Sequence, residues 1–254
     1  MHKFSVCLIC AFAVCLFAQP AIASTISTCT TTGGGAISCT GTIDTPEDVF
    51  LKLFTVSGSG PQAITIQTFG FGGGTNAAGN VISAGGFDSL VALFTSAPET
   101  ILTDGSSNPI ASVPGSTQFF PGCPPAGTVS IGGIATCGDN KLAATLSPGT
   151  YTLLLSDANY VPFAVSPGPP ISSLLSDGFS DLSGGIFQTC TTSGACIGTN
   201  GHFAVDISGV PVTPVPEPTT LVLLAPGLGM LVHKIRRHHQ SKHTNELRAP
   251  DSTT

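Results

Sequence analysis

The sequence predicts an all-β fold, a β-sandwich with disulfides that takes up most of the chain. Its apolar residues come in short runs separated by Gly, Pro, Ser and Thr, which is the spacing of strands and turns. No helical periodicity of apolar residues persists for more than a turn or two before Thr219. Many short strands without intervening helices favour a β-sandwich or a jelly roll.

Seven runs read as strands. In one of them, Asp48–Val56, both faces are apolar, so we expect that strand in the interior of the sandwich. Ser147–Thr150 has Pro and Gly where a type II turn requires them, which predicts an antiparallel hairpin between the runs on its two sides. A short helix at Pro170–Leu175 stays open as one minor element. The predicted strands are Ala36–Ile43, Asp48–Val56, Ala63–Phe69, Ser89–Phe94, Lys141–Leu146, Tyr151–Ser156 and Phe203–Ile207.

The N-terminus has the pattern of a cleavable secretory signal. The first three residues supply a short positive region, and an apolar run follows over residues 4–18. Ala21 and Ala23 occupy the small-residue positions of a cleavage site, so we expect cleavage after Ala23. An uncleaved anchor is the alternative, but the apolar run is shorter than the roughly 20 residues of a spanning helix.

Cysteine usage agrees with export. Three of the nine cysteines lie in the signal, which leaves an even set of six in the exported part. Such a set indicates disulfides rather than zinc, because no C-x-x-C pair occurs among these six cysteines. Other connectivities remain open by count alone. The order along the chain favours three local pairs, Cys29–Cys39, Cys123–Cys137 and Cys190–Cys196.

Charge is unevenly distributed. Between Ser24 and Val215 the only basic residues are Lys52 and Lys141, against eleven acidic residues, which gives a formal net charge of −9. A surface with two cations cannot neutralise a phosphate backbone, so we expect no nucleic-acid partner. The acidic excess suits the solubility of an extracellular domain.

The C-terminal tail consists of three blocks. Residues 211–218 are rich in proline and form a stiff spacer, residues 219–233 are largely apolar, and residues 234–254 begin with a cluster of cations. An apolar stretch of this length also suits a buried core helix. The flanking cations favour a transmembrane segment whose basic end stays in the cytoplasm and whose preceding domain lies outside.

These blocks resemble the PEP-CTERM sorting signal, with Pro216, Glu217 and Pro218 as the tripeptide and Arg236 and Arg237 in the basic end. The resemblance implies processing by an exosortase at the inner membrane of a bacterial cell envelope. Such tails also carry an ice-binding protein C-terminal domain label, which describes the tail and is no evidence for ice binding. The long segment after the arginines departs from the usual pattern.

The expected division of the chain follows from these blocks. It comprises a signal peptide at 1–23, a β-sandwich ectodomain at 24–210, a Pro-rich linker with the PEP motif at 211–218, a transmembrane sorting segment at 219–233 and a basic cytoplasmic tail at 234–254.

Three interior stretches, Gly72–Phe94, Leu146–Phe163 and Gly198–Ile207, resemble exported PEP-CTERM proteins whose domain is similar to bacterial pre-peptidase C-terminal domains. The resemblance implies a jelly-roll-like β-sandwich that stands outside any catalytic domain. The segment Cys123–Cys137 departs from it, because that family commonly has a shorter acidic loop there.

Four aspartates at strand ends or in turns, Asp88, Asp104, Asp139 and Asp157, are candidate calcium ligands, since calcium takes several carboxylate oxygens from such positions. The resemblance also implies that related domains bind calcium. The sequence has no D-x-D-x-D-G loop, and aspartate favours turns for purely conformational reasons. We expect no other cofactor.

The sequence lacks the constellations of an enzyme. Gly70–Thr75 has no lysine and no following helix, so it reads as a flexible turn and not a phosphate loop. His202 is the only histidine of the ectodomain, and no G-x-S-x-G motif accompanies it. Glu47, Asp48 and Glu99 stay open as acids for glycoside hydrolysis, but tryptophan for sugar stacking is absent.

The sequence therefore predicts a non-enzymatic structural or adhesive protein of the cell envelope or extracellular matrix, with an exosortase and extracellular polysaccharide as partners. The alternative is a carbohydrate- or calcium-dependent ligand-binding module. Ice binding is disfavoured, because the threonines at 30–32 and 191–192 form clusters and no periodic array. A cryptic hydrolase would require His202 to lie beside both a serine and an acid.

Overall fold

The computed structural model describes residues 26–112, 123–124, 126–165, 173–209 and 212–214. The predicted signal peptide, the sorting tripeptide Pro216–Pro218 and the predicted transmembrane segment lie outside these residues. The chain divides into two compact units, Met1–Pro214 and Val215–Thr254, and all described residues belong to the first. No helix in the described ranges has the length and apolarity needed to cross a membrane.

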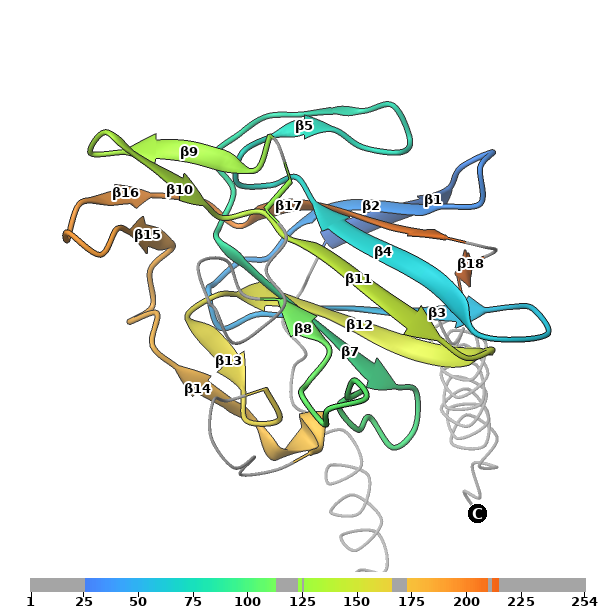
Figure 1. Cartoon of the computed structure of the whole chain (residues 1–254). Coiled ribbons are helices and arrows are strands. Elements are labelled where there is room, and N and C mark those ends of the chain that lie inside the picture. The colour runs from blue at the N-terminus through green and yellow to red at the C-terminus, as the bar shows by residue number, and fades with distance from the viewer. Residues whose placement is uncertain (1–25, 113–122, 125, 166–172, 210–211, 215–254) are drawn as a thin grey trace, which may run out of the picture. The chain divides into compact units, whose positions relative to one another are not determined.

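The described residues form an all-β sandwich, as the sequence predicts (Figure 1). Sheet A has the strand order β1-β2-β17-β4-β11, and sheet B has the order β18-β3-β12-β7-β8. Their pairings are all antiparallel. The strands are β1 (Ile26–Thr31), β2 (Ile37–Thr42), β3 (Phe50–Val56), β4 (Gln62–Thr68), β7 (Ser89–Thr95), β8 (Ala111–Ser112), β11 (Lys141–Leu146), β12 (Gly149–Asp157), β17 (His202–Gly209) and β18 (Val212–Pro214).

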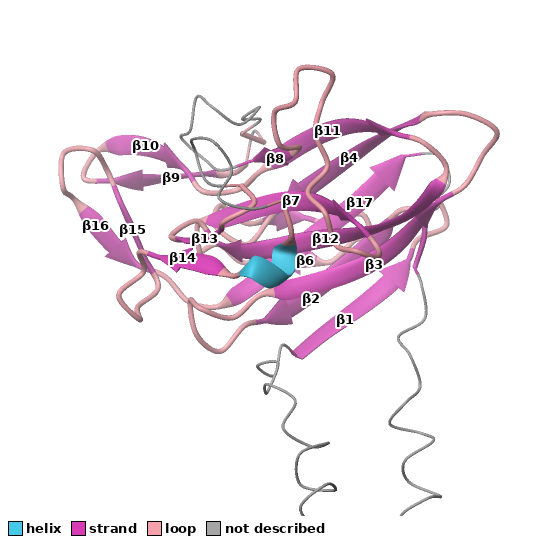
Figure 2. Cartoon of the chain, turned by 90° about the horizontal axis from the view of Figure 1, so that it is seen from below, coloured by secondary structure: helices cyan, strands magenta, loops and turns pink. Residues whose placement is uncertain are grey.

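Eight of these strands have the arrangement of a double-sheet jelly roll. Along the chain, β2, β4, β11 and β17 enter sheet A, while β3, β7, β8 and β12 enter sheet B. The chain therefore crosses repeatedly between the layers, which Figure 2 shows from below. The remaining two strands extend the sheets: β1 lies beside β2 at the edge of sheet A, and β18 lies beside β3 at the edge of sheet B.

The main core lies between the two sheets, where alternate residues of the strands point inward. Phe50 and Phe54 of β3 share this face, and the ring of Phe50 contacts that of Phe203 on β17 with centroids 4.7 Å apart. Ile64 and Ile66 of β4 fill the same layer. Each fully buried side chain of this size contributes roughly 2 kcal/mol to folding.

A second apolar cluster covers the outer face of sheet B. Leu90, Phe94 and Leu154 point away from the main core and pack against Val165 and Leu175 from the connection between β12 and β17. Strand β7 is therefore buried on both faces. The sequence predicted that Asp48–Val56 would be the strand with both faces buried. Strand β3 buries one face only, since Leu51 on the other face is 39% exposed.

The predicted hairpin between Lys141–Leu146 and Tyr151–Ser156 is wrong. Strand β11 pairs with β4 in sheet A, whereas β12 pairs with β3 and β7 in sheet B. Gly149 already belongs to β12 and does not have the positive φ of a type II turn. Pro148 and Gly149 mark a connection between layers, because local turn chemistry does not determine which sheet receives the next strand.

Short ribbons and one 3₁₀ turn surround the sandwich. The predicted minor helix at Pro170–Leu175 overlaps this turn only at its last residue. Strand β18 pairs with β3 and buries Val212, so the folded unit extends beyond the expected boundary at residue 210. The peripheral elements are β5 (Gly74–Thr75), β6 (Val81–Ile82), β9 (Thr128–Ile131), β10 (Ile134–Cys137), β13 (Tyr160–Pro162), η1 (Leu175–Asp177), β14 (Phe179–Asp181), β15 (Gln188–Cys190) and β16 (Cys196–Gly198).

Candidate functional site

Three of the predicted calcium ligands meet at one end of the sandwich. Because β7 and β12 are antiparallel, the start of β7 lies beside the end of β12, and Asp157 pairs with Ser89. The backbone N–H of Ala158 donates to the carbonyl oxygen of Asp88 over 2.8 Å. Asp139, ahead of β11, joins them through Gly138, whose carbonyl oxygen accepts a 3.0 Å hydrogen bond from the Ser89 N–H.

Asp139 is almost completely buried and fully hydrogen-bonded. Its Oδ1 accepts from the Thr68 hydroxyl at 3.0 Å and the Phe71 N–H at 3.1 Å, and its Oδ2 accepts from the Gly72 N–H at 2.6 Å. Burial raises the pKa of Asp139, and these hydrogen bonds oppose that rise. Phe71 and Gly72 belong to the glycine-rich turn Gly70–Thr75, which the sequence predicts is not a phosphate loop. Their backbone N–H groups bind a carboxylate of the same chain.

Asp88 and Asp157 differ from Asp139 because each keeps a buried oxygen without a partner. Oδ1 of Asp88 and Oδ2 of Asp157 accept no hydrogen bond within the described ranges. The other oxygen of Asp157 accepts from the Asn159 N–H at 2.8 Å. Burial raises the pKa of Asp157 to about 6, and burial followed by the charges of Asp157 and Asp139 raises that of Asp88 well above its usual range. The pair can therefore take up a proton or a cation.

A neutral network beside these acids ties the two sheets together. The hydroxyl of Ser112 on β8 donates to Oδ1 of Asn140 at 2.6 Å, and the Asn140 side-chain amide donates to the carbonyl oxygen of Ser89 on β7. The Asn140 N–H donates to the Thr68 hydroxyl of β4 at 2.7 Å. All four residues are buried. Sequence reasoning missed Thr68, Ser89 and Ser112, because serine and threonine are frequent throughout this chain.

Asp104, the fourth predicted calcium ligand, belongs to a different part of the fold. It lies in the tight turn between β7 and β8, where its carboxylate accepts from the N–H groups of Ser106 at 2.8 Å and Asn108 at 2.9 Å. Hydrogen bonds from Asn108, and then from Ser106, lower the pKa of Asp104. Across the described ranges, no group of three or more His, Cys, Asp or Glu side chains has an arrangement that could hold a metal ion.

An aromatic pair with neighbouring acids forms a second polar region, which the sequence did not reveal. The half-buried rings of Tyr160 and Phe179 stack in parallel with centroids 4.5 Å apart. The Ser183 hydroxyl lies 2.7 Å from Oδ1 of Asp181 and 3.1 Å from Oε1 of Glu47, which holds the two carboxylates close. Burial, and then the charges of Asp181 and Glu47, raise the pKa of Tyr160. The stacked rings are therefore partly exposed in a region that also carries hydrogen-bond acceptors.

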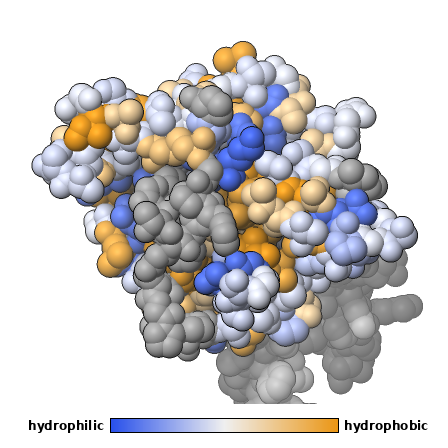
Figure 3. Space-filling view, viewed as in Figure 1, coloured by the Kyte–Doolittle hydropathy of each residue, from blue (hydrophilic) through white to orange (hydrophobic). Residues whose placement is uncertain are grey.

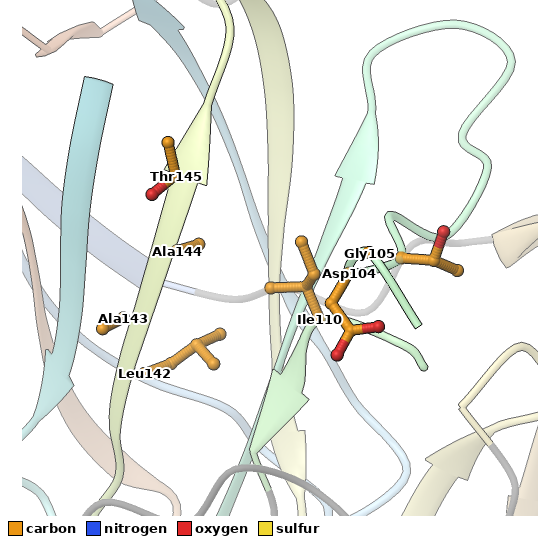
Figure 4. Close-up of a pocket in the computed structure, with 8 residues that line it drawn as sticks. Asp104, Gly105, Ile110, Leu142, Ala143, Ala144 and Thr145 are labelled. Atoms are coloured by element: carbon orange, nitrogen blue, oxygen red, sulfur yellow. The ribbon is translucent and has the colours of Figure 1, made fainter. Parts of the chain in front are cut away.

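A pocket of about 320 Å³ lies between the edge of sheet A and the turn that carries Asp104 (Figure 4). One wall is strand β11, and the other is the segment before β8, with Ile110 pointing toward the strand. On the face seen in Figure 3, apolar surface occurs as separate patches between polar ones. The lining residues are Thr103, Asp104, Gly105, Ile110, Leu142, Ala143, Ala144 and Thr145.

His202 stands at the start of β17, and its side chain contacts the backbone. Its Nε2 lies 3.0 Å from the carbonyl oxygen of Ser83, which assigns the proton of the neutral ring to Nε2. The cryptic-hydrolase hypothesis needs a hydroxyl and an acid beside this ring. The hydrogen bond of Nε2 is to the Ser83 carbonyl oxygen, which is neither a hydroxyl nor an acid.

The six cysteines of the described residues form disulfides in the three local pairs that their order favours. Cys29 is bonded to Cys39, Cys123 to Cys137, and Cys190 to Cys196. The first and third bonds link directly opposite residues of the hairpins β1–β2 and β15–β16. Their sequence separations are 10, 14 and 6 residues, so each bond stabilises a local loop.

No protein-family model matches this chain, and no curated protein sequence does. The sorting residues Pro216, Glu217, Pro218, Arg236 and Arg237 lie outside the described residues.

Proposed function

We propose that this chain is an exported, non-enzymatic structural or adhesive protein of the cell envelope or extracellular matrix. The observation that carries the proposal is the pairing of all six ectodomain cysteines in disulfides within an all-β domain. Disulfides persist in oxidising compartments, and the N-terminal sequence has the pattern of a secretory signal.

The C-terminal sequence supports sorting through the membrane. Pro216, Glu217 and Pro218 precede the apolar block, and Arg236 and Arg237 follow it. In this proposal the tail resembling PEP-CTERM signals holds the chain in the inner membrane until an exosortase processes it. The ectodomain is then released to the envelope or to the surrounding polysaccharide.

Fractionation of the full chain tests this proposal. An epitope inserted after the exposed Gly33 reports the ectodomain in the membrane, periplasmic and extracellular fractions of an exosortase-bearing host. We expect deletion of residues 216–237 to move it out of the membrane fraction and to abolish processing. Arg236→Ala with Arg237→Ala should impair processing, whereas Lys242→Ala should not. The same distribution with and without residues 216–237 would overturn the sorting proposal.

Calcium-dependent ligand binding is a second candidate function, favoured by the unpartnered buried oxygens of Asp88 and Asp157. Calcium at these oxygens should raise the Tm of the full chain, and the rise should disappear in Asp88→Asn. Asp104→Asn serves as the matched control, because its carboxylate lies in the turn before β8. An equal Tm in excess calcium and in chelator would remove this candidate.

Carbohydrate binding is a third candidate function. The Tyr160–Phe179 pair, which lies beside Asp181 and Glu47, favours it. A sugar ring places its apolar face on an aromatic side chain, and carboxylates accept its hydroxyl protons. Retardation in gels that contain the host's extracellular polysaccharide measures this binding. We expect Tyr160→Ala to abolish the retardation and Phe163→Ala to preserve it. Equal mobility with and without polysaccharide would exclude this ligand.

A further inference from the structure

Among the strands of the described ranges, β11 is the last strand of sheet A on its side. It pairs with β4 along its whole length, and no other described strand pairs with it. The Thr68 N–H donates to the carbonyl oxygen of Asn140 over 2.9 Å. This bond shows which alternate residues of β11 direct their backbone groups toward β4. Because antiparallel pairing alternates, Leu142, Ala144 and Leu146 bond to β4, and the intervening residues direct their N–H and C=O groups outward.

Two residues with outward-directed backbone groups border a pocket. Ala143 and Thr145 belong to the outward set, and both line the pocket of about 320 Å³. Across from them lie Gly105 and Ile110 (Figure 4). The side chains at 143 and 144 are methyl groups, so a second backbone can approach β11 closely.

The edge has little of the protection that open strands usually carry. Natural edges are shortened, bulged, or blocked by proline and inward-pointing charges. Strand β11 runs for six residues in regular register with β4, and its one charged residue, Lys141, lies at its first position. The edge of sheet B on the same side is β8, which has two residues.

Charge indicates which kind of strand fits. The residues from Ser24 to Val215 carry a formal charge of −9, and Asp104 places a carboxylate on the pocket wall. Its hydrogen bonds from Asn108 and Ser106 lower its pKa, so it is ionised at neutral pH. A second copy of the chain would bring the same acidic charge to the contact, whereas a basic segment is attracted to it.

We propose that β11 binds an extended, basic peptide segment of a partner protein, which adds as a further strand to sheet A and places one side chain in the pocket before β8. Backbone hydrogen bonds at Ala143 and Thr145 supply the affinity, and the pocket together with Asp104 selects the side chains. This inference rests on the proposed adhesive function in one respect: it requires a partner protein outside the cell. Peptide binding and sorting are measured separately, so either can fail without the other.

The test uses the full chain and a labelled peptide, acetyl-Lys-Val-Thr-Val-Thr-Lys-amide, in fluorescence anisotropy. We expect saturable binding that weakens with salt. The same peptide with every amide N-methylated has no N–H to donate from either edge, and its affinity should fall at least about tenfold. Replacement of both lysines by glutamate should weaken binding as well. Equal affinity for the N-methylated peptide would overturn the proposal.

Proline variants locate the binding strand. Ala143→Pro removes one outward N–H without removing a bond to β4, and we expect it to lower affinity at least about tenfold. Ser27→Pro is the matched control on β1 at the other edge of sheet A. The Thr32 N–H donates to the Ala36 carbonyl oxygen. By the same alternation, the backbone N–H of Ser27 is directed away from β2 and makes no bond to it. An equal loss in both variants would contradict a site at β11.

Gly105→Phe keeps the proposal testable if Ala143→Pro does not fold. Gly105 lines the pocket, a Cβ there meets no atom within 4 Å, and its φ is not in the range that favours glycine, so a Phe side chain can take up pocket space without displacing β11. We expect it to weaken peptide binding. Hydrogen exchange provides a second readout, since peptide should slow exchange at Ala143 and Thr145. Slow exchange there without peptide would mean that the chain or a second copy covers the edge, and would overturn the proposal.

Discussion

Oδ2 of Asp139 accepts a 2.6 Å hydrogen bond from the backbone N–H of Gly72, which lies far from it in the sequence. The same carboxylate binds the Phe71 N–H and the Thr68 hydroxyl, so one side chain fixes both the end of β4 and the turn that follows it. The acidic end of the sandwich therefore contains one structural carboxylate and, beside it, two whose hydrogen bonding is incomplete.

Asp139→Ala should destabilise the domain strongly. The substitution leaves two buried N–H groups and a hydroxyl without their acceptor, at a cost of about 2 to 5 kcal/mol. Urea unfolding of the full chain measures the loss, and exchange of the Phe71 and Gly72 amides should accelerate. Asp44→Ala on the exposed surface is the control and should change stability little. A loss of similar size in both variants would contradict the assigned role.

Stability should decrease as pH rises through the range in which Asp157 ionises. Burial raises the pKa of this carboxyl to about 6 in the folded chain. The unfolded carboxyl titrates near 4, so the folded state binds the proton more tightly and its stabilising effect disappears between about pH 4 and 6. The full effect is about 3 kcal/mol. Burial also raises the pKa of Asp88, so its ionisation weakens the fold in the same direction.

Asp157→Asn should flatten this pH dependence, because the amide does not ionise and its Nδ2 can donate toward the unpartnered oxygen of Asp88. The free energy of unfolding in urea, measured from pH 4 to 8, gives the comparison. Asp44→Asn should retain the slope of the unmodified chain. Identical slopes for the unmodified chain and Asp157→Asn would show that Asp157 is not the titrating group.

Gly201→Ala should destabilise the entry to β17. A Cβ at this position would lie 1.9 Å from the carbonyl oxygen of Ile43, and the Gly201 carbonyl oxygen accepts the Ile43 N–H at 2.9 Å. Backbone must move to relieve the clash, at a cost of about 2 kcal/mol or more. Gly198→Ala, where a Cβ meets no atom within 4 Å, should be close to neutral in the same thermal melts. Equal Tm values would refute the close approach.

Loss of a disulfide should cost more where the closed loop is longer. Replacement of Cys123 and Cys137 by alanine opens a loop with a separation of 14 residues, and we expect a loss of about 3 kcal/mol. The Cys190 and Cys196 pair, with a separation of 6, should cost somewhat less. Urea unfolding of the double variants ranks the two. Alkylation of any of these four cysteines without reductant would argue against the pairing.

Sequence patterns revealed elements whose physics is local. The seven predicted strands all occur, because each has alternating or continuous apolar residues between turn residues. Asp88, Asp139 and Asp157 were recognised as acids at strand ends, and strand order brings these three together, whereas Asp104 lies in the turn before β8. The Tyr160–Phe179 stack and the Asn140 network depend on contacts between distant segments, for which a single sequence has no periodic signal.

The position of β18 has a mechanical consequence for a chain tethered by its tail. Tension applied beyond Pro214 first reaches a three-residue strand that, among the described strands, pairs with β3 alone. The next described strand inward, β17, is bonded to β2 on one side and β4 on the other, so more hydrogen bonds must break before it detaches. A tethered domain would therefore lengthen slightly under weak pulling and resist strongly thereafter.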